Sequence, residues 1–171
     1  MHDEPGVQVP ATRKAVKYIP VTLEYVKYQV GTTPEEVSEL RHLTFTNYSY
    51  AGMLKELGVD DADTKSKASI EKATKTLKSD SIRKGCTMIW AAMLTEDPLL
   101  TVDDVMKMVD IAQFQELTLE VVRAMAYYVN GPLAHVEADE AVDSARESIE
   151  EAQAELEKAA SDTEEDPEKK S

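Results

Sequence analysis

The spacing of apolar residues changes near residue 47, and this change sets the expected fold class. Residues 16–30 are rich in β-branched and aromatic side chains that alternate with polar ones, which is typical of a strand. Residues 31–34 indicate a turn, and residues 39–46 alternate again. Pro20 has no N–H to donate, so its strand is expected to lie at a sheet edge or to be broken there. The sequence therefore predicts a small antiparallel sheet near the N-terminus.

After the sheet, apolar residues recur every three or four positions, as on the buried face of an amphipathic helix. A first helix is predicted over residues 48–57, and four more are predicted before residue 133. The residues expected on the buried faces are Tyr50, Met53, Leu54, Leu57, Ile70, Ala73, Thr74, Leu77, Ile82, Cys86, Ile89, Trp90, Met93, Leu94, Val102, Val105, Met106, Val109, Leu119, Val122, Met125, Ala126 and Val129. The fold class is α+β and mainly α, with a small strand region followed by a helical bundle.

Helix ends are marked by residues with known capping roles. Pro98 ends one helix, and Thr101 with Asp104 three positions later forms a capping-box pattern that starts the next. Thr118 is the expected N-cap of the last domain helix, and Gly131, between Asn130 and a proline, is placed to stop it.

Length and charge limit the number of domains and the classes of partner. A chain of 171 residues with 42% hydrophobic residues can form one sizeable core. A formal net charge of -14 repels phosphate backbones and anionic lipids, so neither nucleic acid nor a membrane is expected as a partner. The single cysteine, Cys86, indicates a reducing compartment, and no apolar stretch is long enough for a membrane span. A cytosolic protein is expected.

The charge is concentrated at the C-terminal end. Residues 135–171 hold 14 Asp or Glu and 4 Lys or Arg, which gives 4 − 14 = −10 of the total. We expect a flexible arm over residues 1–15, a domain over 16–133 and an acidic tail over 134–171 that is helical and then disordered. Apolar residues at alternating four- and three-residue spacings predict one seam along the tail helix: Ala138, Val142, Ala145, Ile149, Ala152, Leu156 and Ala159.

Two interpretations of this tail remain open. In the first, the helix is solvated on all sides and frays into the disordered end. In the second, the three large seam residues, Val142, Ile149 and Leu156, dock onto a partner. Met88 and Met108 are further candidates for partner binding because they lie off the main helical stripes, where exposed apolar area favours a protein partner.

No catalytic, cofactor-binding or metal-binding residue is predicted. The glycines are scattered singly and form no phosphate loop, and the three histidines show no metal-ligand spacing. Cys86 lies on an apolar stripe, where a thiol is inert. Two carboxylate pairs, Glu96 with Asp97 and Asp103 with Asp104, support an enzyme only weakly, because neighbours in sequence point to different sides of a helix.

Several segments together resemble the tail assembly chaperones of long-tailed bacteriophages and the related gene-transfer-agent proteins. The segments are VKYIPVTL, LTFTNYSYAGMLKELGV, IRKGCTMIWAAMLTEDPLLTVDDVMKMVD and LTLEVVRAMAYYVNG. The most specific part is IWAAMLTEDPLLTVDDVMKMVD, a helix followed by an acidic proline-containing loop and a threonine-capped helix. The resemblance covers about two thirds of the chain, from about residue 16 to residue 130.

The resemblance implies a non-enzymatic protein of the host bacterial cytoplasm. It implies binding to the tape-measure protein, and in some cases to the tail-tube protein, which the chaperone keeps soluble during tail assembly. In many such phages a ribosomal frameshift adds a longer C-terminal part, and residues 135–171 are then the unshifted end. Self-association into a homo-oligomer is compatible with this class. The alternatives are a head–tail connector or minor virion subunit and, less favoured, a small enzyme with a carboxylate site.

Overall fold

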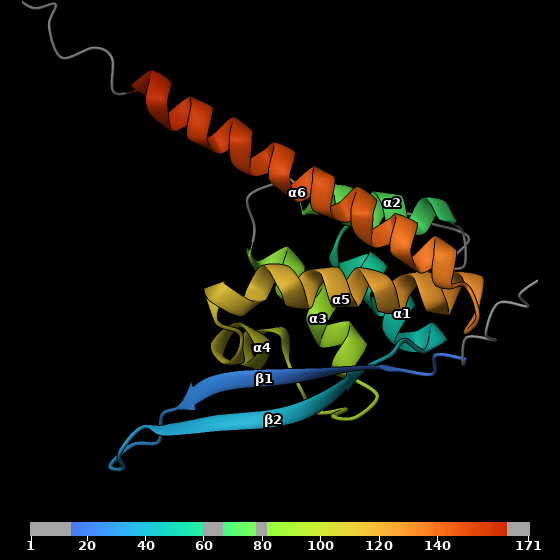
Figure 1. Ribbon diagram of the computed structural model, residues 1–171. Helices are drawn as coiled ribbons and strands as arrows, with labels where there is room; N and C mark the ends of the chain where they lie inside the picture. The colour runs from blue at the N-terminus through green and yellow to red at the C-terminus, as the bar shows by residue number, and fades with distance from the viewer. Residues whose placement is uncertain (1–14, 60–66, 78–81, 164–171) are drawn as a thin grey trace, which may run out of the picture.

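The computed structural model describes residues 15–59, 67–77 and 82–163. The expected arm, apart from residue 15, and the expected disordered end after residue 163 lie outside the described residues. The chain forms β1 (Ile19–Lys27), β2 (Glu35–Leu43), α1 (Asn47–Glu56), α2 (Lys67–Thr76), α3 (Ile82–Met93), α4 (Val102–Met108), α5 (Ile111–Asn130) and α6 (His135–Thr163). The predicted class, α+β and mainly α, is confirmed. Figure 1 shows α5 between the hairpin on one side and α6 on the other.

The two strands form an antiparallel hairpin that pairs from Ile19 opposite Leu43 to Lys27 opposite Glu35. Buried Ile19, Leu23 and Leu43 lie on its inner face, as the alternation of apolar and polar residues predicts. The second strand begins at Glu35 and not at residue 39. Glu35, Glu36 and Ser38 lack the apolar alternation because this end of the hairpin is exposed. Its predicted end at residue 46 is also wrong, because Thr46 is the N-cap of α1.

Helix α3 lies at the centre of the bundle and contacts α1, α4, α5 and β2. A Cβ at Gly85 would lie 2.2 Å from Phe114 Cζ, so the absent side chain lets the α5 ring reach the α3 backbone. Trp90, expected on the buried face, packs against the core cluster but is only partly buried, and its indole N–H donates to the Leu100 carbonyl at 2.7 Å. Ile82, at the start of the predicted stripe, is exposed.

The predicted capping box of α4 is present. The Thr101 hydroxyl accepts from the Asp104 backbone N–H at 3.2 Å, and Asp104 accepts from the Thr101 N–H at 3.0 Å. Val105 is buried, but Met106, expected to face inward, is exposed, since this short helix covers the core with one residue per turn.

Helix α5 begins earlier than predicted. Asp110 is its N-cap and accepts from the Ala112 N–H at 3.2 Å. Thr118 lies inside the helix, where its hydroxyl donates to the Phe114 carbonyl four residues earlier at 2.8 Å. A threonine hydroxyl can either accept from a backbone N–H as an N-cap or donate to a carbonyl inside a helix, and the sequence prediction of an N-cap at Thr118 is wrong. The predicted stop is correct, since α5 ends at Gly131, whose φ of 103° is disfavoured for other residues.

The core continues past Leu133, where the domain was expected to end. Ala138, Val142 and Ala145 of α6 belong to the same buried cluster as α5 and the hairpin. Figure 1 shows α6 crossing over α5 and α2, with its C-terminal end extending beyond the other helices. The first half of the expected tail is therefore part of the folded body.

Candidate interaction surface

The two methionines predicted to bind a partner lie against the core. Met88 is 0% exposed, so the expectation that it presents apolar surface is wrong. Met108 is partly buried and packs against the core cluster. Met88 lies off the main apolar stripe of α3, but α3 is surrounded by other elements on several sides, so positions off its stripe are buried too. Met106, which the sequence analysis placed on a buried face, is exposed.

The three large seam residues of α6 have different surroundings. Val142 is 3% exposed, Ile149 is half-buried and packs against the core cluster, and Leu156 is 58% exposed. The small seam residues follow the same gradient, from buried Ala138 and Ala145 to exposed Ala159. One continuous apolar seam is thus covered by the body at its start and open to solvent at its end. We call residues 149–161 of α6 the outer seam segment.

Polar contacts fix the beginning of α6 on α5. Arg123 Nη1 donates to Asp139 Oδ1 at 2.6 Å, and the Tyr127 hydroxyl lies 2.8 Å from His135 Nδ1. Burial alone would lower the pKa of Arg123, but the hydrogen bond to Asp139 and the negative charges of Glu120 and Asp139 outweigh it and raise the pKa. These polar contacts lie within the first two turns of α6, and in the outer seam segment Ile149 packs against the core cluster while Leu156 is exposed.

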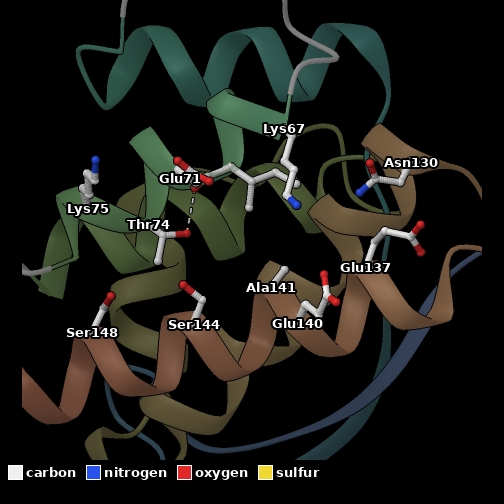
Figure 2. A pocket seen from close by; sticks show the side chains of 11 residues that line it. Lys67, Glu71, Thr74, Lys75, Asn130, Glu137, Glu140, Ala141, Ser144 and Ser148 are labelled. Carbon is white, nitrogen blue, oxygen red and sulfur yellow. Dashed lines mark hydrogen bonds between the residues drawn. The ribbon is translucent and has the colours of Figure 1, made fainter.

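A groove of about 390 Å³ runs between α2 and α6. Figure 2 shows Lys67, Glu71, Thr74 and Lys75 on the α2 side, and Glu137, Glu140, Ala141, Ser144 and Ser148 on the α6 side. Both charge signs line it, and the Thr74 hydroxyl is already bonded to the Ile70 carbonyl at 2.7 Å. This volume fits a small molecule, but the lining lacks the mainly apolar character of most ligand pockets. The groove lies beside the seam of α6 and is lined partly by residues of the same helix.

The carboxylates considered for an enzyme have structural partners. Glu96 accepts from the His42 backbone N–H at 3.0 Å and also contacts the His42 ring. Burial would raise the pKa of Glu96, but these hydrogen bonds outweigh burial and lower it. Asp103 pairs with Arg83 at 2.9 Å, and Asp104 caps α4. Glu96 and Asp103 thus link separate elements of the fold, Asp104 caps its own helix, and Asp97 accepts from the Leu99 N–H at 3.3 Å.

The Cys86 thiol and the placement of possible metal ligands bear on whether the described residues form a reactive site. Burial raises the pKa of the Cys86 thiol, which keeps it protonated. Among residues 15–59, 67–77 and 82–163, no group of three or more His, Cys, Asp or Glu is placed to hold a metal ion. No described helix combines the length and the apolar character that crossing a bilayer requires.

A second surface was not found from the sequence. The outer edge of β2 runs along the side of the hairpin that faces away from β1, and the helices leave most of it open (Figure 1). The sequence EEVSELRHL contains no Pro or Lys, two residues that often block further pairing at the edge of a sheet. This absence could have indicated an edge that is open to pairing. That signal has meaning only once β2 is known to have one pairing partner.

Comparison of this chain with protein-family models, with curated proteins and with solved structures finds no match in any of the three.

Proposed function

We propose that this protein is a tail assembly chaperone of the long-tailed phage type, acting in the cytoplasm of the bacterial host. Its partners are the tape-measure protein and the tail-tube protein, as the sequence resemblance implies. The observation that carries a protein-binding role is the seam of α6, which is buried against α5 at Val142 and open to solvent at Leu156. An apolar stripe that continues past the body it packs on is a surface for another helix.

The chemistry of the outer seam segment fits a helical partner with an apolar stripe. Ile149 and Leu156 lie seven residues apart on the same face, with Ala152 between them. Covering Leu156 contributes up to roughly 1.5–3 kcal/mol, covering the half-buried Ile149 contributes less, and ordering the exposed helix offsets part of the sum. Such binding is weak and reversible. A chaperone must release its partner when the tail tube closes around the tape measure, so weak binding suits the role.

The charge of the same segment explains how a complex stays in solution. Glu150, Glu151, Glu155 and Glu157 flank the seam in this segment, and Lys158 is its one basic residue. When the seam is covered by a partner, these acidic side chains remain exposed, and like charge on neighbouring complexes keeps them apart. An apolar tape-measure helix gains a negative coat by binding here.

The test is co-expression with the tape-measure and tail-tube proteins of the same phage, followed by pull-down. Leu156→Glu and Ile149→Glu each place a charge on the seam and are expected to reduce capture at least tenfold. Because Ile149 packs against the core cluster, circular dichroism checks that Ile149→Glu still folds. Ala154→Glu adds the same charge on the face of α6 that points away from Ile149 and Leu156, and it is the matched control. The proposal is wrong if both seam variants capture as much partner as the control does.

Val142→Glu is not a clean test of binding, although the sequence favoured it. Val142 is part of the core, so this variant tests folding. Mass spectrometry of purified virions addresses the connector alternative. A chaperone is absent from finished particles, whereas recovery of the chain in stoichiometric amount would identify a structural subunit.

A further inference from the structure

The two edges of the hairpin are treated differently by the rest of the fold. In an antiparallel pair, backbone N–H groups of alternate residues point away from the partner strand. Glu24 N–H donates to the Gln113 side chain of α5 at 3.3 Å, and His42 N–H donates to Glu96, so residues of this parity point outward. On β1 the outward positions are further limited by Pro20, which has no N–H. The β1 edge is thus blocked at Pro20, which has no donor, and at Glu24, which is bonded to α5.

The edge of β2 remains open over its central part. By the register, the outward N–H groups of β2 belong to Glu36, Ser38 and Leu40. In the described part of the chain none of the three has a hydrogen-bond partner on this edge. The strand is nine residues long and pairs with β1 without a bulge. A long, regular edge strand without a proline or a bulge is a template for another strand whose charges complement its own.

We propose that β2 pairs antiparallel with β2 of a second copy of this chain, centred on Ser38, to form a continuous four-stranded sheet. In this register Ser38 lies opposite the partner's Ser38, and Glu36 lies opposite the partner's Leu40. Each of these facing pairs exchanges two backbone hydrogen bonds. Leu40, which is 61% exposed in the single chain, gains a neighbouring strand.

Charge selects this register over its neighbours. Centring on Ser38 places Glu35 opposite the partner's Arg41, so two opposite-charge pairs form across the twofold axis. Centring on Val37 would place Glu35 opposite Glu39, and centring on Glu39 would place Glu39 opposite itself. Both of these registers set like charges directly across the strands, which is destabilising.

The ends of the strand fit the same register. Centring on Ser38 places Pro34 opposite the partner's His42. Pro34 has no N–H to donate, and the His42 N–H is already bonded to Glu96. The ladder therefore ends on both sides where neither residue has a free donor, and no backbone N–H is left unpaired by the pairing itself.

Sedimentation equilibrium of the full chain tests the pairing. The weight-average mass is expected to rise with concentration from one chain toward two. Ser38→Pro removes the central donor and is expected to give a single chain at every concentration. Val26→Pro places the same ring on the outward edge of β1, beside an open hollow, and should leave self-association unchanged. Circular dichroism of both variants checks that the hairpin body still folds. A wild-type chain that stays single at its solubility limit overturns the proposal.

Two further variants test the register. Glu35→Arg faces Arg41 across the axis and is expected to weaken dimerisation about tenfold, whereas Glu36→Arg, with the same charge change opposite Leu40, should have a smaller effect. Ser38→Cys should form a disulfide-linked dimer on mild oxidation, because facing residues in such a pair lie about 5.5 Å apart. Glu24→Cys, one strand further from the axis, should not. Equal cross-linking of both cysteines would contradict the register.

This inference uses the hairpin and not α6. Loss of dimerisation with intact capture of the tape-measure protein, or the reverse, would therefore show which of the two proposals fails.

Discussion

The two halves of α6 share one sequence pattern and have different environments. Apolar residues continue at the same spacing from Ala138 to Ala159, yet the first half is buried against α5 and the second half is exposed. The difference comes from the length of the helices that lie beneath it. Helix α5 ends at Asn130 and turns back into α6, so α6, with 29 residues, extends past the start of α5, which has 20. A periodic stripe therefore identifies the face of a helix that binds something, and the surrounding fold decides whether this is its own body or another molecule.

Truncation should separate the two halves most strongly. A chain that ends at Leu133 loses Ala138, Val142 and Ala145 from the core and exposes the α5 face beneath them. We expect a loss of about 5 kcal/mol, which is comparable with the whole stability of many domains, and therefore aggregation or partial unfolding. A chain that ends at Gln153 should unfold at nearly the same urea concentration as the full chain. Equal stability of the two truncated chains would show that α6 does not belong to the core.

Single charges on the seam should give a smaller contrast of the same kind. Val142→Glu buries a carboxylate without a partner and is expected to cost about 3–5 kcal/mol of the free energy of unfolding. Leu156→Glu lies in solvent and should change it by less than about 0.5 kcal/mol. Urea denaturation followed by circular dichroism measures both. A costly Leu156→Glu would mean that the outer half is also packed against the body.

Loss of the ion pair at the start of α6 should weaken docking of the first half only slightly. Arg123→Gln removes the bond to Asp139, and because both side chains remain partly exposed we expect a loss of about 0.5–1 kcal/mol. Amide exchange should increase in the first turns of α6 and stay unchanged in the outer seam segment. An equal increase along the whole helix would contradict the view that only the first half is fixed.

A substitution far from α6 should leave the contrast between its halves intact while changing the pH dependence of stability. Glu96 has a lower pKa in the folded chain than its usual 4.5, so its contribution is present above that value and is lost as the pH falls through the folded pKa. Near neutral pH we expect Glu96→Gln to lower the stability by about 1 kcal/mol. The difference between wild type and variant should shrink as the pH falls below 4.5. A difference that persists at pH 3 would assign the effect to packing.

The elements of this fold could largely be predicted from the sequence, but their surroundings could not. The hairpin, the α4 capping box and the α5 stop at Gly131 depend on local chemistry, and the structure confirms them. Thr118 and Met88 were assigned wrongly, because the choice between a cap and an internal bond, or between a core and a surface methionine, depends on elements distant in sequence.

The candidate surfaces divide in the same way. The seam of α6 was visible in the sequence, but its division at about Ile149 depends on where α5 and α2 lie. The open edge of β2 was not visible, because a strand edge is defined only by the absence of a second neighbour. Local periodicity predicts faces, and only the assembled fold shows which of them remain uncovered.

Hydrogen exchange of the full chain, alone and with the tape-measure protein, is the most direct test of the central claim. In the free chain, amides near Val142 should be protected and those from about residue 150 onward should exchange rapidly, because only the first half is covered. In the complex the outer seam segment should become protected around Leu156. Protection of that segment in the free chain, or no change there on binding, would contradict the claim that this half of α6 is the docking surface.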